Sequence, residues 1–389
     1  MPMNLDLDAL FRHCEATESS DLHLAPGQPP YCRTKGRLAP LPDLPLTPAQ
    51  LHHAALRLLS AMARTDPAAA LETALARRGS IDGACTSPSG ARYRFNIYRT
   101  QSPLPPPGAP AAASLPDPAL PSIAIALRRL DDRFRSLDEL GIPARLADCC
   151  AHRHGLVVIS GPTGSGKSTT LATLIDQINR TRPGHIITIE DPVEYIHRSA
   201  LSLVNQRQVG IDAPSFNDAL VDSLREDPDV VLVGEIRDVA TIRTAITAAE
   251  TGHLVFTTLH AGDCVGAIER LVSVFPSGEQ EAIRRQLSLV LRTIAVQLLL
   301  PAATPPDAPP RRVPACEILV NTPAIANLVA TGKSPQIYSA IETGTSSGMQ
   351  TLEQDLARLV REGAITPQTA FAVARYPDTL RSRLRIRPA

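Results

Sequence analysis

Tryptophan is absent from the sequence, and aromatic residues together make up only 3% of its 389 residues. Few rings are available to stack on bases, which counts against a protein that binds single-stranded nucleic acid. The sequence also has no excess charge of either sign, because 39 basic residues balance 39 acidic ones. It therefore lacks the overall positive field that attracts a nucleic-acid backbone. We expect no nucleic-acid partner.

The sequence has no segment typical of export or of membrane insertion. Its first eight residues, MPMNLDLD, offer neither a basic n-region nor an apolar h-region, which predicts no signal peptide and a cytoplasmic protein. The most apolar long stretch, residues 287–300, is interrupted by Arg292 and Gln297 and is too short to cross a bilayer. We expect a buried helix there and no membrane span. The seven cysteines include no Cys-x-x-Cys pair, which is typical of free thiols in a reducing compartment.

Composition divides the chain into four regions. Residues 1–100 mix helical and strand patterns and predict a small α/β domain. The prolines within residues 101–136 predict an extended insertion and linker, with a proline-rich ligand for a partner domain as the alternative. Residues 137–300 alternate short apolar strands with helix-sized segments, which predicts a largely parallel sheet covered by helices. Residues 301–389 begin with further prolines and are predicted to be mostly helical.

A phosphate-binding loop is predicted at residues 161–169, which read GPTGSGKST. The pattern GxxxxGK[ST] follows an apolar strand and precedes a helical pattern, which is the context that a P-loop requires. In such a loop the backbone N–H groups turn toward the phosphates, the lysine reaches the β- and γ-phosphate oxygens, and the serine binds Mg²⁺. Only three lysines occur in the whole chain, so a chance match is improbable. We expect ATP and Mg²⁺ as cofactors, with Thr163, Gly164, Ser165, Gly166, Lys167, Ser168 and Thr169 as nucleotide-binding residues.

Acidic and histidine residues flank the predicted strands. Glu190 follows the strand IITI and Glu235 follows VVLVG, at the carboxyl ends where parallel sheets bind ligands. Nucleotide hydrolysis needs a carboxylate that orients or deprotonates water and another group that holds Mg²⁺, although such acids can also be helix caps. His253 precedes the strand LVFTT and His260 follows it, so the two imidazoles are expected at opposite ends. A structural, hydrogen-bonded histidine is the alternative reading of each.

The segment RYRFNIYR in the first region predicts a strand with two different faces. Tyr93, Phe95 and Ile97 share one face, while Arg92 and Arg94 share the other. The arginines are either solvated or reach a nucleotide on a neighbouring subunit, where they would stabilise charge during phosphoryl transfer.

The order of these motifs resembles that of the secretion ATPase superfamily. The chain has the Walker A sequence GPTGSGKST, the acidic box ITIEDPVEY, the Walker B-like DPDVVLVGEIRD and the histidine box AAETGHLVFTTLH, together spanning at least residues 155–270. The segments SDLHL, RYRFN, LDELGIP and MQTLEQDLARLVREG extend the resemblance across most of the chain, toward the retraction ATPases of type IV pili. The resemblance implies an α/β protein with a RecA-like P-loop ATPase core, a smaller N-terminal PAS-like α/β domain and a helical C-terminal region.

The resemblance also implies a role for each matching residue. Glu235 would be the catalytic base, and Glu190 would be the acidic-box carboxylate near Mg²⁺. Ser168 and these two carboxylates form the implied metal set. The histidine-box pair would be His253 and His260. The inter-subunit arginines, which would face a neighbour's nucleotide, would be Arg92, Arg94 and Arg128.

A ring motor is the assembly that the resemblance implies. It would be a homo-hexamer, or a mixed ring with a paralogue, that acts on an inner-membrane pilus platform protein and drives pilus retraction and twitching motility. Extension and type II secretion ATPases usually carry a further N-terminal domain and a four-cysteine zinc motif, and this sequence shows neither. However, the helix AIRNLIRE of retraction ATPases reads AIANLVAT at residues 324–331 and loses its charged face. Pilus extension or secretion, an accessory subunit of a paralogous ring, and a nucleic-acid motor of the same fold are the alternatives.

Overall fold

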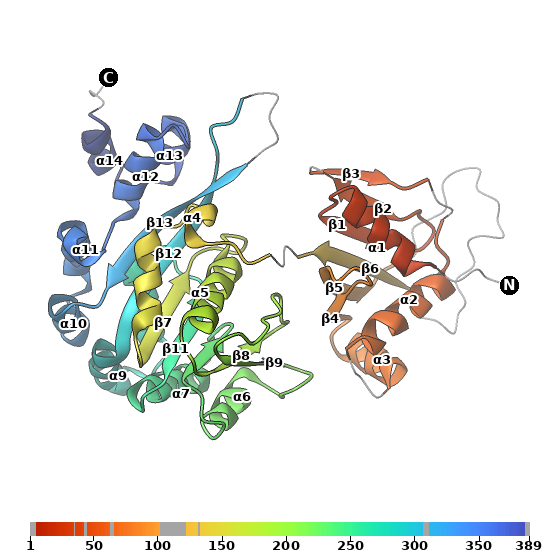
Figure 1. Ribbon diagram of the computed structural model, residues 1–389, viewed down its shortest axis with the longest axis horizontal. Coiled ribbons are helices and arrows are strands. Elements are labelled where there is room, and N and C mark those ends of the chain that lie inside the picture. The colour runs from red at the N-terminus through yellow and green to blue at the C-terminus, as the bar shows by residue number, and fades with distance from the viewer. Residues whose placement is uncertain are drawn as a thin grey trace. The chain divides into compact units, whose positions relative to one another are not determined.

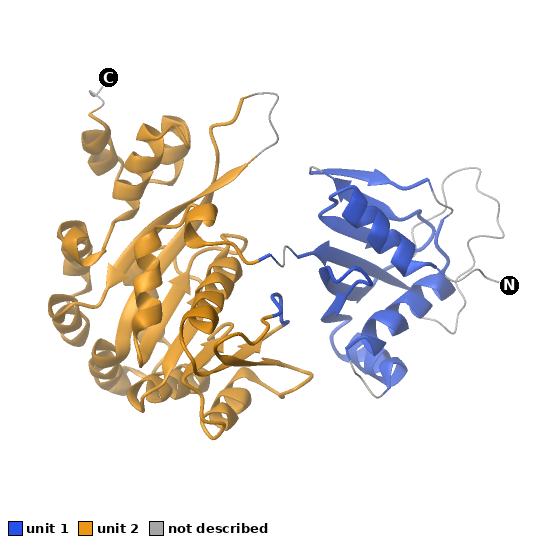
Figure 2. Ribbon diagram, viewed as in Figure 1, with its two compact units in different colours: residues 1–133, 192–196 blue, residues 134–191, 197–389 orange. Residues whose placement is uncertain are grey.

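Contacts within the chain divide it into two units in the computed structural model. Unit 1 comprises residues 1–133 and 192–196, and unit 2 comprises residues 134–191 and 197–389 (Figure 2). The predicted proline-rich insertion falls largely on residues 102–121, outside the described part of the chain. The structure describes residues 5–34, 36–42, 45–62, 66–101, 122–130, 133–305 and 311–385.

The described residues of unit 1 form a six-stranded antiparallel sheet in the order β3-β2-β1-β6-β5-β4 and three helices (Figure 1). Helix α2 begins at Pro48, and Thr47 and Gln50 form a capping box that satisfies two backbone N–H groups at its start. The elements are α1 (Leu7–Ala16), β1 (Asp21–Leu24), β2 (Tyr31–Thr34), β3 (Arg37–Pro40), α2 (Pro48–Ser60), α3 (Pro67–Arg77), β4 (Ser80–Thr86), β5 (Arg92–Arg99) and β6 (Ile123–Arg129).

The two-faced strand predicted in this unit is β5. Tyr93, Phe95 and Ile97 are at most 1% exposed, and the Tyr93 ring lies 4.6 Å from the Phe11 ring of α1, centroid to centroid. Burying these apolar side chains fixes the register of the strand, because a slip by one residue would exchange its two faces. Arg92 and Arg94, which alternate with Tyr93 and Phe95, consequently point to the other face of the sheet.

Unit 2 contains a seven-stranded sheet in the order β13-β12-β7-β11-β10-β8-β9 (Figure 1). All neighbouring pairs are parallel except β12 with β13, so the predicted, largely parallel sheet is confirmed. The four strands expected from apolar runs are all present and almost fully buried. The strands are β7 (Gly155–Ser160), β8 (His185–Glu190), β9 (Leu203–Gln208), β10 (Val230–Val233), β11 (Leu254–Leu259), β12 (Leu291–Pro301) and β13 (Arg312–Val320).

Helices cover both faces of this sheet. Alternate residues of its strands point to opposite faces, and each face packs against its own set of helices. Val157 and Phe256 pack on one face with α5, and Val158 and Val255 pack on the other with α7 and α8. This three-layer arrangement confirms the α/β fold class. The helices before β12 are α4 (Leu137–Leu140), a 3-10 helix (Ala144–Ala151), α5 (Lys167–Thr181), α6 (Phe216–Ser223), α7 (Val239–Glu250), α8 (Cys264–Ser273) and α9 (Ser277–Val290).

The prediction of one buried helix over residues 287–300 is wrong. Helix α9 ends at Val290, and the chain continues as strand β12 from Leu291. This strand lies between β7 and β13 and is covered on both faces, so its residues are apolar in succession rather than in alternation. Periodicity alone cannot distinguish such a strand from a buried helix.

The C-terminal helices belong to the same unit as the P-loop core. Leu356 and Leu380 pack against Leu300 of β12 and Ala315 of β13. Among the described residues, none of the helices has the length and apolar character needed to span a membrane. These last helices are α10 (Pro323–Ala330), α11 (Ile337–Thr343), α12 (Leu352–Arg361), α13 (Pro367–Val373) and α14 (Pro377–Leu384).

Candidate nucleotide site

The predicted P-loop connects β7 to the N-terminus of α5. Gly161 and Gly166 adopt positive φ angles of 139° and 91°, which side-chain-bearing residues rarely adopt. A Cβ atom on Gly161 would lie 2.2 Å from the backbone oxygen of Gln297 in β12. The loop therefore needs glycine both for its conformation and for its close approach to the neighbouring strand.

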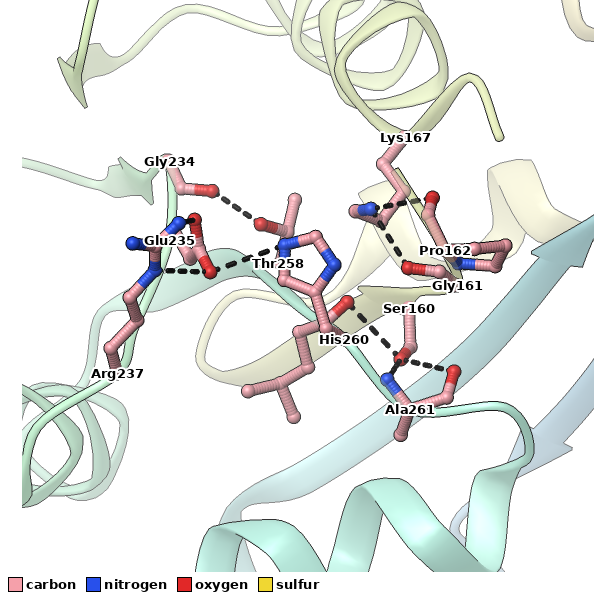
Figure 3. A network of polar contacts seen from close by, with 11 residues as sticks. Ser160, Gly161, Pro162, Lys167, Gly234, Glu235, Arg237, Thr258, His260 and Ala261 are labelled. Atoms are coloured by element: carbon pink, nitrogen blue, oxygen red, sulfur yellow. Dashed lines mark hydrogen bonds and ion pairs between the residues drawn. The ribbon is translucent and has the colours of Figure 1, made fainter. Parts of the chain in front are cut away.

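Lys167 folds back over this loop (Figure 3). Its Nζ atom donates to the backbone oxygens of Gly161 at 2.8 Å and Pro162 at 3.0 Å. Burial lowers the pKa of Lys167, and the negative charge of Glu235 opposes this shift. The ammonium group is thus held at the loop by neutral carbonyls, which a phosphate could replace as its partner.

The remaining loop residues suit an anionic ligand. The hydroxyl of Ser165 is buried and, within the described part of the chain, has no hydrogen-bond partner. Thr163, Gly164 and Ser168 are exposed, and Thr169 is half-buried. An orphaned buried hydroxyl, the N-terminus of a helix and one lysine fit a bound phosphate group.

Glu235 follows β10 and contacts His260, which follows the neighbouring strand β11 (Figure 3). The distance from Glu235 Oε1 to His260 Nε2 is 3.2 Å. Arg237 binds the same carboxylate with both Nε and Nη2, each at 2.6 Å. Burial lowers the pKa of His260, and the positive charge of Lys167 lowers it further. The P-loop lysine and the Glu235–His260 pair therefore form one electrostatic site.

Hydrogen bonds fix the strand ends that carry this site (Figure 3). Thr258 donates to the Gly234 oxygen at 2.6 Å, which ties β11 to the residue before Glu235. Ser160 donates to the Ala261 oxygen at 3.0 Å and accepts the Ala261 N–H at 2.9 Å. The end of β7, where the P-loop begins, is thereby joined to the residue after His260.

Glu190 ends β8, at the same edge of the sheet. Because Ile189 pairs with Val233 in β10, Glu190 lies beside Gly234, the residue that precedes Glu235. Its Oε1 atom accepts hydrogen bonds from Thr188 Oγ1 at 2.7 Å and Gln206 Nε2 at 3.3 Å. The structure thus places both predicted carboxylates at one edge of the sheet.

His253 lies apart from this group. It precedes β11, and its Nδ1 atom is 3.0 Å from the Ala248 oxygen at the end of α7. The structure therefore places the two histidines at opposite ends of one strand, and only His260 contacts the Glu235 carboxylate.

The three candidate arginines lie on one face of the unit 1 sheet. Arg94 of β5 stands directly opposite Arg128 of β6, and alternation puts Arg92 on the same face. Arg128 contacts Asp21 Oδ1 at 2.8 Å but keeps 72% of its side chain exposed. Arg92 donates to Thr86 Oγ1 at 3.1 Å. The sheet register therefore brings Arg128 beside Arg92 and Arg94, from which it is far apart in the sequence.

Two polar residues of the site were missed by the sequence analysis. Arg237 lies two positions after Glu235 in the motif GEIRD, which by itself assigns it no role. Gln297 of β12 interrupts an apolar run in the sequence, and its side chain binds both the P-loop and α5. A polar residue inside an otherwise apolar segment was the available signal, since a buried amide needs partners.

Comparisons with known proteins agree with this geometry. The chain is 39% identical over 374 residues to the type IV pilus retraction ATPase PilT of Pseudomonas aeruginosa, covering 96% of this chain and 99% of that protein. It is 34% identical to the type IV pilus ATPase PilU of the same organism, over 98% and 92% of the two chains. A crystal structure of the pilus retraction motor PilT with bound ADP matches with a TM-score of 0.83 and 37% identity, over 97% of this chain and all of the other.

The family model for type II/IV secretion system proteins matches residues 113–366. The solved structure of the Legionella pneumophila ATPase DotB also matches, with a TM-score of 0.78 and 25% identity over 96% of both chains. The chain belongs to the type II/IV secretion system protein family.

Proposed function

We propose that this protein is an ATP-hydrolysing ring motor that retracts type IV pili. The observation that carries the proposal is the Glu235–His260 contact at the carboxyl ends of β10 and β11, next to β7, whose end leads into the loop that Lys167 contacts. It is supported by the relatives named as pilus retraction ATPases and by the solved relative that binds ADP.

Different residues of unit 2 serve different steps of ATP binding and hydrolysis. Lys167 and the loop N–H groups bind the β- and γ-phosphates and offset their charge. Glu235 orients the attacking water and accepts its proton, while His260 holds the carboxylate. Mg²⁺ would neutralise phosphate charge when bound, and the oxygens of Ser168, Glu190 and Glu235 are the hard donors that it prefers. The positive charge of Arg237 offsets part of the negative charge of the Glu235 carboxylate.

A neighbouring subunit completes the site in this proposal. The face that carries Arg94 and Arg128 is exposed, and arginines of this kind stabilise phosphoryl transfer when they reach a nucleotide from outside its own subunit. A closed ring, proposed here as a hexamer or a mixed ring with a paralogue, would present each set of arginines to the next nucleotide. The proposed partner is the pilus platform protein of the inner membrane, reached from the cytoplasm.

A second candidate is an accessory subunit of a paralogous ring. Helix α10 favours it, because Ala326 and Ala330 stand where retraction ATPases carry arginine. Ile325 and Val329 are fully buried, so this helix still packs although its outer face has lost charge. An accessory subunit would bind nucleotide but contribute little turnover of its own.

Fibre dynamics in the native host test the proposal. A gene deletion and a Glu235→Gln strain are compared by counting surface fibres and by following labelled fibres over time. Abundant fibres that fail to shorten in both strains are the result we expect for a retraction motor. Missing fibres would indicate extension or secretion instead, and a defect in the deletion but not in the Glu235→Gln strain would indicate the accessory role.

A further inference from the structure

Strand β12 brings Gln297 next to the P-loop. Val296 pairs with Ser160, the last residue of β7, so Gln297 lies beside Gly161, the first residue of the loop. Gln297 is only 4% exposed. Its amide must therefore find partners inside the protein, because a buried amide without hydrogen bonds is costly.

Both polar atoms of the Gln297 side-chain amide form hydrogen bonds. Gln297 Nε2 donates to the backbone oxygen of Ser165 at 2.7 Å, and Gln297 Oε1 accepts the hydroxyl of Thr170 at 2.8 Å. Ser165 belongs to the loop and Thr170 to the first turn of α5. A Cβ atom on Gly166 would lie 2.8 Å from Gln297 Nε2, so the glycine also makes room for this contact. The side chain of Gln297 thus links both the P-loop and helix α5 to strand β12.

The bond to Ser165 sets the direction of one loop N–H group. In a trans peptide the carbonyl and the following N–H point in opposite directions. Holding the Ser165 oxygen toward Gln297 therefore turns the N–H of Gly166 away from β12. Within the described residues, this N–H donates to no acceptor. It is one of the donors that a P-loop offers to a phosphate.

We propose that Gln297 is a positioning residue for phosphate binding: it fixes the peptide between Ser165 and Gly166 so that the Gly166 N–H faces the nucleotide phosphates. The inference rests on the proposed ATPase function and deepens it. Gln297 acts through the loop and touches no phosphate. Without it, the peptide could rotate and the loop would have to be ordered by the nucleotide itself, at the expense of affinity.

The test compares two variants of the full-length protein. Gln297→Met keeps the side-chain volume and removes both hydrogen bonds, whereas Gln297→Glu keeps an acceptor for Thr170 and loses the donor to Ser165. We expect both to weaken ADP binding by about tenfold or more, and to raise KM for ATP more than they lower kcat. Affinity for ADP is measured with a fluorescent analogue, and thermal unfolding is followed without nucleotide.

Gln350→Met is the matched control, because Gln350 Nε2 also donates to a backbone oxygen of this sheet, that of Cys316, at 2.9 Å. It should change thermal stability but not ADP affinity. If Gln297→Met does not fold, Gln297→Glu decides. Folded Gln297 variants with wild-type ADP affinity and KM would overturn the inference alone. Wild-type protein that binds no ADP would instead contradict the proposed function.

Discussion

The Oε1 atom of Glu235 lies 3.2 Å from the Nε2 atom of His260. Because burial and the positive charge of Lys167 lower the pKa of His260, the neutral imidazole predominates at pH 7. A neutral imidazole that faces a carboxylate through Nε2 carries its proton there and donates it in a hydrogen bond. His260 can then orient Glu235 as a neutral hydrogen-bond donor, beside the Arg237 guanidinium that contacts both carboxylate oxygens.

Replacing Glu235 with glutamine should separate binding from hydrolysis. Gln keeps the size of the side chain and a hydrogen-bond acceptor for His260 but cannot take a proton. We expect ATP turnover to fall by about 100-fold or more, while ADP affinity stays within about twofold of wild type. Steady-state phosphate release and ADP titration measure the two effects. Glu190→Gln is the companion variant, and normal turnover in Glu235→Gln would assign the base to Glu190.

Lys167→Ala should weaken phosphate binding strongly. The ammonium group is the positive charge of the loop, so its loss should weaken ADP binding by roughly 10- to 100-fold. Lys333→Ala provides the matched control, because Lys333 also stands in a Gly-Lys-Ser sequence, but in a turn after α10. That variant should bind ADP and turn over ATP like wild type. Equal loss in both variants would mean that the effect of Lys167 is not local.

The acidic limb of the pH–rate profile should depend on His260. Burial and the positive charge of Lys167 lower the pKa of His260, so the neutral imidazole predominates near pH 7. As the pH falls through the lowered pKa, the imidazole becomes an imidazolium and forms an ion pair with Glu235, which makes the carboxylate a poorer base. Turnover should therefore decline on the acid side.

His260→Asn removes this titration, and His253→Asn is its control at the other end of β11. We expect the acid inflection in kcat to disappear only in His260→Asn. An unchanged acid limb in that variant would show that another group controls it.

Local chemistry explains which features the sequence could predict. The P-loop lies between an apolar strand and a helix, and the capping box of Thr47 and Gln50 lies within four residues, so each is readable without a tertiary structure. The buried strands β7 and β11 are recognisable because both of their faces are apolar.

Pairing between distant segments explains what was missed. Strand β12 has the same unbroken apolar character as a buried helix, and only its place beside β7 settles its conformation. The partners of Gln297 are more than 120 residues away in sequence, at separations of 127 and 132. Sequence spacing likewise carries no information on the pairing of Arg94 with Arg128, which depends on the register of β5 and β6.

Arg94 and Arg128 should act on the nucleotide of a neighbouring subunit. Arg94→Ala should lower turnover by about 100-fold or more and leave ADP affinity unchanged, because an arginine from outside stabilises the transition state rather than the bound nucleotide. Arg99→Ala is the matched control, since Arg99 is exposed on the same strand but alternates to the opposite face. It should keep wild-type turnover.

Mixed rings test whether the arginine acts between subunits. Arg94→Ala subunits keep Glu235, and Glu235→Gln subunits keep Arg94, so each inactive protein supplies what the other lacks. Mixing the two should restore part of the ATP turnover, at those interfaces where an intact base meets an intact arginine. If mixtures that demonstrably exchange subunits stay as inactive as their components, then Arg94 serves its own subunit and the proposed completion of the site by a neighbour is wrong.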